Sequence, residues 1–187
     1  MRLAMIAAIL LVGAAPATAQ SPADESVPKA ATVDDMAVLE PYVGRFRSED
    51  KTYDNSDVTY FFVIDYQWYD KKKTILRYKL ERHSPALDRI DGIGEGYYYF
   101  DSSNGRIGVF GVFPDGRMGQ GSMGEFDRQT SSRAVWVSGT SPDGKPVQVR
   151  DAFEIIDKDH WRNVTQVRLD GGDWQVIGRD TYTRMTD

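Results

Sequence analysis

The stretch that decides the fold is residues 58–82, VTYFFVIDYQWYDKKKTILRYKLER. Two runs rich in aromatic and branched apolar residues flank a short charged segment, which is the composition of a β-hairpin. In the first run every second side chain is apolar or aromatic, and these residues are Tyr60, Phe62, Ile64, Tyr66 and Trp68. Because alternate side chains of a strand share one face, this run predicts a strand with a buried face.

The same rhythm continues to the C-terminal end of the sequence. Segments rich in Asp, Asn, Ser, Pro and Gly separate the apolar runs, as hairpin turns do; they are residues 70–73, 102–105, 114–116, 141–144, 157–160 and 170–172. Strands are predicted over residues 58–69, 74–82, 90–101, 106–113, 117–126, 133–140, 146–156, 161–169 and 174–184. No long helical pattern lies between them, which argues against parallel βαβ units.

A further strand is predicted to begin at Tyr42, which makes about ten strands in sequence. The predicted fold is therefore all-β, an antiparallel meander. A meander of this length closes into a barrel, because closure removes the exposed edge strands. Thr32 or Asp34 is expected to cap a short helix over residues 35–40, and Pro41 is expected to end it.

The N-terminal sequence has the pattern of an export signal. Arg2 precedes an apolar stretch, residues 3–15, that is too short to span a bilayer, and Ala17-Thr18-Ala19 fits a cleavage site. Cleavage before Gln20 implies an exported protein, periplasmic in a bacterium or extracellular. The predicted organisation is a signal peptide over residues 1–19, a disordered leader over 20–32 and a single barrel domain over 33–187.

The composition restricts the chemistry and the partners. The chain of 187 residues has no cysteine, which excludes disulfides, thiolate nucleophiles and cysteine metal sites. Its net charge is −5 and the sequence shows no basic cluster, which argues against nucleic acid and anionic membranes as partners. No later apolar run is long enough to span a membrane. Turn chemistry explains Asp157, Asp159 and His160, so we predict no metal site and no cofactor.

The two ends of the predicted barrel carry a family resemblance. Gly44-Arg45-Phe46 opens the first strand, and the last strand ends on Arg184. With the short helix before it, this arrangement resembles the calycin barrels, which comprise lipocalins, fatty-acid-binding proteins and nitrobindin-like proteins. The resemblance implies a closed barrel whose interior holds a ligand. It also implies that Arg184 packs across the ring of Phe46, which stands where the lipocalin pattern has Trp.

The sequence departs from this family in two places. Fatty-acid binders read the ligand carboxylate with Arg-x-Tyr in the last strand, whereas this chain has Tyr182-x-Arg184 in reverse order. A nitrobindin-like haem site would use a His near the C-terminal strands, and none follows His160. The resemblance therefore gives neither a haem site nor the identity of a ligand.

Charged residues within apolar strand faces are the candidate site. Glu95, Asp151, Asp180, Arg184 and Arg82 each interrupt such a face. An unpaired charge inside a barrel is costly, so these groups must pair, contact water or bind a ligand. An arginine would anchor an acidic head group against an aromatic wall. The residues predicted to bind ligand are Arg184, Tyr182, Asp180, Arg82, Tyr60, Tyr66 and Trp68.

Three functions remain open at this stage. The favoured one is non-catalytic binding of a small apolar or amphipathic molecule, including an acidic one, in the barrel. The second is a barrel enzyme of isomerase, cyclase or hydrolase type, with Asp151 or Glu95 as general acid or base. The third is a structural or interaction protein whose own Tyr and Trp side chains fill the barrel. The oligomeric state is also open.

Overall fold

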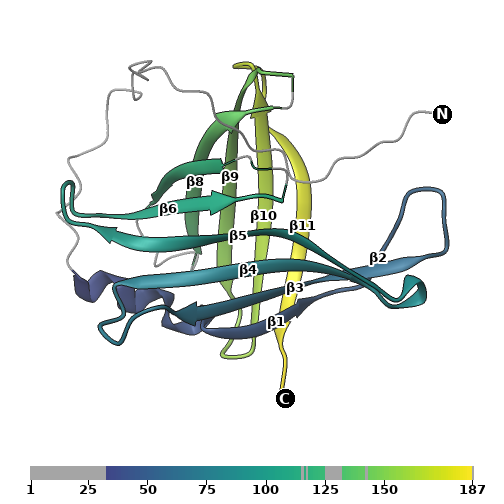
Figure 1. Cartoon of the computed structure of the whole chain (residues 1–187), viewed down its shortest axis with the longest axis horizontal. Helices are drawn as coiled ribbons and strands as arrows, with labels where there is room; N and C mark the ends of the chain where they lie inside the picture. Colours follow the sequence, from purple (N-terminus) through teal and green to yellow (C-terminus); the bar gives the residue numbers. More distant parts are fainter. Residues whose placement is uncertain (1–32, 115, 117, 125–131, 142, 187) are drawn as a thin grey trace.

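The structure is a computed structural model that describes residues 33–114, 116, 118–124, 132–141 and 143–186. A 3-10 helix, η1 (Val33–Tyr42), precedes eleven strands (Figure 1). These are β1 (Gly44–Ser48), β2 (Lys51–Thr52), β3 (Thr59–Trp68), β4 (Ile75–Ser84), β5 (Arg89–Asp101), β6 (Arg106–Val112), β7 (Met118–Met123), β8 (Ser132–Thr140), β9 (Pro146–Ile155), β10 (His160–Leu169) and β11 (Gln175–Arg184). A short 3-10 turn, η2 (Pro85–Leu87), joins β4 to β5. The predicted signal peptide and leader lie outside the described residues.

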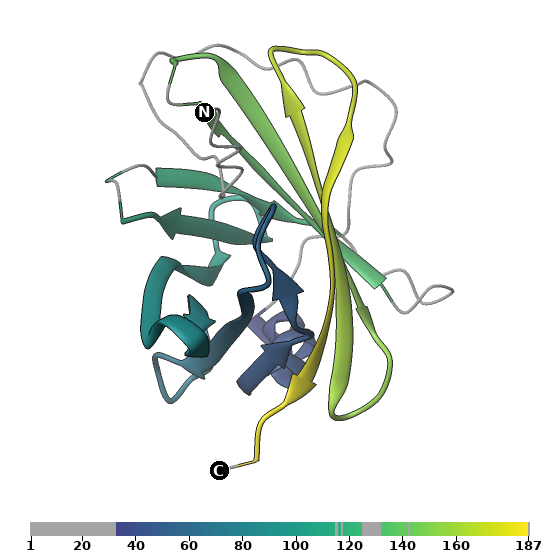
Figure 2. The ribbon, with the colours of Figure 1, turned by 90° about the vertical axis from the view of Figure 1, so that its right-hand side faces the viewer.

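Ten of the strands close into an antiparallel barrel. Each strand from β3 to β11 pairs with the next, and β1 pairs with both β11 and β3, which closes the ring. The two-residue β2 pairs only with β3 and continues the line of β1. In Figures 1 and 2 the strands β3–β6 and β8–β11 run across each other at a steep angle. The predicted fold class is confirmed.

The N-terminal elements differ in detail from the prediction. The helix is of the 3-10 type and runs through Pro41 to Tyr42. Its end is tightened by a bond from the Val43 amide to the Glu40 carbonyl (3.1 Å), the i to i+3 spacing of a 3-10 turn. The first strand begins at Gly44. In the predicted loop between β1 and β3, β2 forms because the chain stays close enough to β3 to pair with it.

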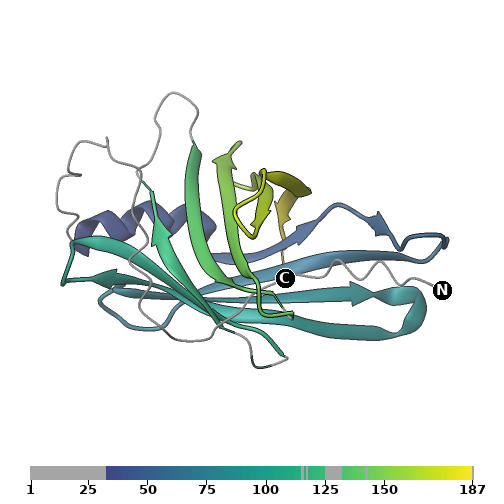
Figure 3. The ribbon, with the colours of Figure 1, turned by 90° about the horizontal axis from the view of Figure 1, so that it is seen from above.

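The helix η1 lies at one end of the barrel (Figure 3) and supplies part of the core. Its side chains Met36, Leu39 and Tyr42 are all buried. They pack against inward-facing side chains of the strands, which include Phe46, Tyr66, Leu76, Tyr98, Ile107, Phe153, Trp161 and Tyr182. The helix therefore closes this end of the barrel.

The expected packing of Arg184 on Phe46 is confirmed. The two residues are register partners, and the Arg184 guanidinium lies 4.4 Å from the centre of the Phe46 ring. It donates to the carbonyls of Val43 (2.6 Å), Pro41 (3.0 Å) and Lys158 (3.2 Å). Arg184 thus ties the junction of η1 and β1 to the turn between β9 and β10.

Gly44 makes this closure sterically feasible. It has φ +119°, and a Cβ there would lie 2.6 Å from Nη1 of Arg184. Both the backbone conformation and the close approach favour glycine at this position.

Candidate functional site

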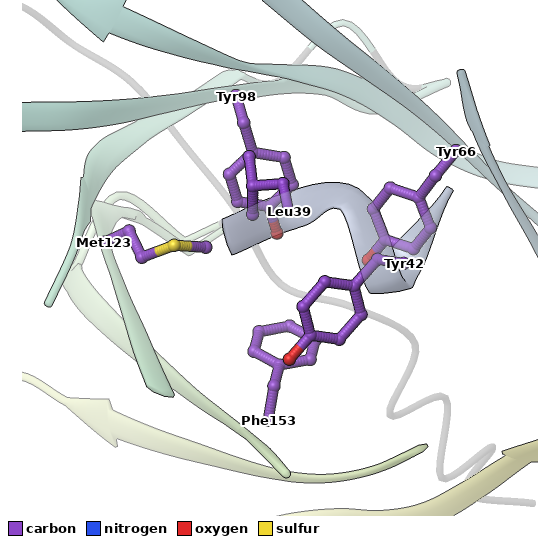
Figure 4. Close-up of a pocket in the computed structure, with 6 residues that line it drawn as sticks. All are labelled: Leu39, Tyr42, Tyr66, Tyr98, Met123 and Phe153. Carbon is purple, nitrogen blue, oxygen red and sulfur yellow. The ribbon is translucent and has the colours of Figure 1, made fainter. Parts of the chain in front are cut away.

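The half of the barrel interior nearest η1, here called the closed half, is filled by the protein's own side chains. Trp161 and Tyr182 stack with ring centres 4.1 Å apart, and Tyr42 meets the edge of Trp161 at 5.7 Å. Figure 4 shows the small cavity that remains among these side chains, which is lined by Leu39, Tyr42, Tyr66, Tyr98, Met123 and Phe153. Its volume is about 10 Å³, the space of about one water molecule. The closed half therefore has no room for a ligand.

The other half, here called the open half, differs in solvent access. Several inward-facing residues there are only partly buried, and they include Phe62, Tyr78, Leu80, Asp151, Asn163 and Thr165. Apolar side chains also line it, because Val147, Val149 and Val167 form a buried cluster next to Val137. Solvent thus reaches a partly apolar interior surface in this half.

Five polar side chains meet on the inner surface of the open half. This inner polar cluster consists of Lys51, Asp151, Asn163, Thr165 and Asp180. Strand register places Asp151 opposite Thr165, and Asn163 opposite Asp180. The Thr165 hydroxyl donates a hydrogen bond to Oδ1 of Asp151. The Asn163 amide donates to Oγ1 of Thr165 at 3.3 Å and lies 3.5 Å from the same Asp151 oxygen.

The two carboxylates of the cluster have different partners. Asp180 Oδ1 lies 2.7 Å from Nζ of Lys51, so its charge is paired. Asp151 receives hydrogen bonds only from neutral groups, and no cation of the described residues is in contact with it. Burial raises the pKa of Asp151 to about 6, against the hydrogen bonds from Thr165 and Asn163, which lower it. The nearby charge of Asp180 raises this pKa further.

The cluster contains more hydrogen-bond acceptors than donors. The buried Oδ1 of Asn163 has no donor within the part of the chain that the structure describes. Oδ2 of Asp151 likewise receives no hydrogen bond from the described residues. A buried acceptor without a partner is unfavourable, so Oδ1 of Asn163 favours a molecule that brings a hydrogen-bond donor.

Arginines lie at both ends of the barrel, but each is already engaged by other groups of the protein. At the open end, Nη2 of Arg82 lies 2.8 Å from Oδ2 of Asp91, and its guanidinium lies 5.4 Å from the centre of the Tyr53 ring. At the closed end, main-chain carbonyls accept from Arg184. Neither guanidinium belongs to the inner polar cluster.

The remaining residues predicted for the site are spread over the molecule. Tyr66 and Tyr182 are buried in the closed half, and burial raises the pKa of each hydroxyl. Trp68 donates to Oε2 of Glu40 in η1 at 3.0 Å. Tyr60 lies at the open end, where its ring is 4.6 Å from that of Tyr53. The predicted site residues do not form one constellation.

Glu95, the alternative acid or base, lies on the outer surface of the barrel. Its neighbours in sequence, Gly94 and Gly96, are on the inward face with Tyr98, so Glu95 points outward. Its side chain is 44% exposed and lies 2.7 Å from Nη2 of Arg77. The expectation that Glu95 shares the interior with Asp151 is wrong, because tyrosines occupy both faces of this strand and hide which face is buried.

A larger hollow on the outer face of β1, β3 and β4 has the character of ordinary charged surface. Its volume is about 270 Å³, and it is lined by Arg45, Val63, Asp65, Lys79 and Glu81. Lys79 Nζ lies 2.6 Å from Oε1 of Glu81. We therefore place the candidate site in the open half of the barrel.

Comparisons with known proteins support the fold alone. No protein-family model and no curated protein matches the sequence. A solved structure, Rv2717c from M. tuberculosis, is similar in fold with a TM-score of 0.53 and 15% sequence identity. The similarity covers 81% of this chain and 97% of that chain. Among the described residues, no helix is long and apolar enough to cross a membrane.

Proposed function

We propose that the protein binds a small amphipathic molecule in the open half of its barrel. The inner polar cluster would hold the ligand's polar head, and the apolar side chains of the open half would contact its hydrocarbon part. The observation that carries this proposal is the Asp151 carboxylate, which is partly buried and accepts hydrogen bonds from Thr165 and Asn163 but has no cationic partner among the described residues.

The chemistry of the cluster favours a head group that donates hydrogen bonds, such as an amine or a hydroxyl. Asp151 and Asn163 offer acceptors without donors, and a protonated amine would also neutralise the carboxylate. An acidic head group would need a free cation. The guanidinium groups of Arg82 and Arg184 are engaged by Asp91 and by carbonyls, so an acidic ligand is the less favoured class.

The N-terminal sequence supports a role outside the cytoplasm. Residues 1–19 have the charge, apolar stretch and small-residue site of a signal peptide, and cleavage before Gln20 would release the barrel into the periplasm or medium. We propose that residues 33–187 then act as one non-catalytic binding domain. N-terminal sequencing of the exported protein tests this, and an intact Met1 would contradict it.

Thermal unfolding with three ligands of equal chain length tests the binding proposal. Octylamine and octan-1-ol should raise the melting temperature, and octanoate should raise it less. Asp151→Asn should abolish the preference for octylamine, because the variant has no charge to pair. Glu95→Gln, which removes a carboxylate from the outer surface, is the matched control and should retain the preference for octylamine. A larger shift with octanoate, or an unchanged preference in Asp151→Asn, would contradict the proposal.

A catalytic role is the second candidate, because burial raises the pKa of Asp151 to about 6. A general base works best when its pKa lies near the working pH. The hydrolysis of a p-nitrophenyl octanoate ester should then follow the ionisation of Asp151 and disappear in Asp151→Asn. Equal hydrolysis by the wild type and this variant would leave binding as the function of the site.

A further inference from the structure

The outer face of β8–β11 carries an unusual row of side chains. Trp136 is the register partner of Arg150, Arg150 of Gln166, and Gln166 of Val176. The intervening residues of these strands face the interior, so this row faces outward. Figure 1 shows the four strands side by side. We call the outward residues Trp136, Arg150, Arg162, Arg168, Trp174, Val176 and Arg179 the arginine–tryptophan face.

This face is basic, although the whole chain has a net charge of −5. It holds four arginines, and Glu154 is the single acidic residue among the described outward positions of these strands. Glu154 pairs with Arg162 at 2.7 Å. Arg150, Arg168 and Arg179 have no carboxylate partner in the described part of the chain. Three positive charges are therefore uncompensated on one surface.

Two tryptophans lie among these arginines. The rings of Trp136 and Trp174 meet edge to face with centres 5.7 Å apart, although two strands separate their positions. The guanidinium of Arg150 lies 4.9 Å from the Trp136 ring, and that of Arg168 lies 4.9 Å from the Trp174 ring. Each indole thus has a cation on its face.

Exposed apolar side chains extend the same surface. Trp136 is 42% exposed, Val176 46% and Ile177 41%. Tryptophan beside arginine and exposed aliphatic residues is the composition of surfaces that rest at the headgroup level of a bilayer. The uncompensated arginines add attraction to anionic lipids, which is on the order of fivefold in affinity for each cation near the surface.

We propose that the arginine–tryptophan face docks the protein on an anionic lipid bilayer. The arginines would contact lipid phosphates, and the exposed indole and aliphatic side chains would enter the headgroup region. Docking by this face leaves the barrel interior free, so the proposal does not depend on the ligand. Stacking of nucleic-acid bases is less favoured, because arginines already cover the faces of Trp136 and Trp174.

Vesicle co-sedimentation tests the proposal. The protein should bind phosphatidylcholine vesicles that contain phosphatidylglycerol, bind pure phosphatidylcholine weakly, and lose affinity as salt rises. Arg150→Gln with Arg168→Gln should weaken binding by about 25-fold. Lys71→Gln with Lys72→Gln, which removes the same charge from an exposed turn, should weaken it by less than about twofold. All variants share the N-terminus of the wild type, so any contribution of residues 1–32 is constant.

A second variant covers the case in which the double arginine variant fails to fold. Arg179 is exposed and has no side-chain partner in the described structure, and Arg179→Gln should still lower binding about fivefold. Equal losses in the lysine control and the arginine variants would overturn the proposal. Competition by inorganic phosphate that abolishes vesicle binding at constant ionic strength would also overturn it. The same holds if the protein binds a single-stranded oligonucleotide but no vesicles.

Discussion

The two halves of the barrel interior are built from the same strands but differ in content. In the closed half, η1 inserts Leu39 and Tyr42, and inward residues such as Phe46 and Leu76 are completely buried. In the open half the same alternation brings in Asp151, with Asn163 and Thr165 around it. Apolar filling stabilises the fold, whereas a buried carboxylate destabilises it. The comparison separates the part that supports the barrel from the part that we assign to ligand binding.

The largest expected effect compares two leucines on one face of β4. Leu76 is fully buried in the closed half, and Leu80 is partly exposed in the open half. Leu76→Ala should lower the free energy of unfolding by about 3–4 kcal/mol, because it leaves a cavity in a packed core. Leu80→Ala should cost about 1–2 kcal/mol, since less area is buried. Denaturant unfolding measures both, and equal losses would mean that the halves are packed alike.

The two barrel-end arginines give the next comparison. Arg184→Gln removes charged hydrogen bonds to three main-chain carbonyls and should cost about 2–3 kcal/mol of unfolding free energy. Arg82→Gln breaks a partly exposed ion pair with Asp91 and should cost about 1 kcal/mol or less. Denaturant unfolding measures the loss of stability in both arginine variants. A greater loss for Arg82→Gln would show that the open end, and not the closed end, holds the barrel together.

The third expected effect on the free energy of unfolding has the opposite sign, because removing the Asp151 charge should stabilise the protein. The pKa of Asp151 is about 6 in the folded protein and 3.8 for a free side chain, so the folded state binds the proton more tightly. The contribution of Asp151 to stability is present below pH 4 and is lost as the pH rises to 6. The pKa difference corresponds to about 3 kcal/mol at pH 7, and weaker hydrogen bonds to an amide offset part of it. Asp151→Asn should therefore be more stable than the wild type by about 1–2 kcal/mol.

Unfolding of both proteins between pH 3 and pH 8 measures this difference. Acidic groups with lowered pKa values, such as Asp91 and Asp157, titrate in both proteins, so the difference isolates position 151. A variant that is less stable than the wild type at pH 7 would mean that the carboxylate is compensated in the fold and does not await a ligand.

The strands were predictable because turn residues separate them sharply. Most predicted strand limits lie within one or two residues of the observed ones, as in Arg106–Val112 and Gln175–Arg184. The closing contact of Arg184 with Phe46 followed from the family resemblance. The division of the interior into halves was not predictable, because how deeply η1 enters the barrel depends on tertiary packing.

The inner polar cluster was only partly predictable. Asp151 and Asp180 are conspicuous because a charge interrupts an apolar face, whereas Asn163 and Thr165 are neutral and occur on either face of strands. Counting outward from the turn at residues 157–160 would have placed Thr165 opposite Asp151. Lys51 was not predicted as a member of the cluster, because its neighbours in sequence have the composition of a loop.

Whole-chain charge was a poor guide to the outer surface. The sequence shows no basic cluster, because Arg150, Arg168 and Arg179 are more than ten residues apart. Strand register brings Arg150, Arg168 and Arg179 onto one face. Only the three-dimensional pairing of the strands reveals this surface.

The most direct test of the ligand proposal is an NMR titration of the Asp151 carboxyl carbon with and without octylamine. We predict a pKa of about 6 in the free protein and a clearly lower pKa when octylamine is bound, because the ammonium stabilises the carboxylate. Octanoate should not lower it. An Asp151 pKa that octylamine leaves unchanged at saturation would contradict the assignment of the open half as the binding site.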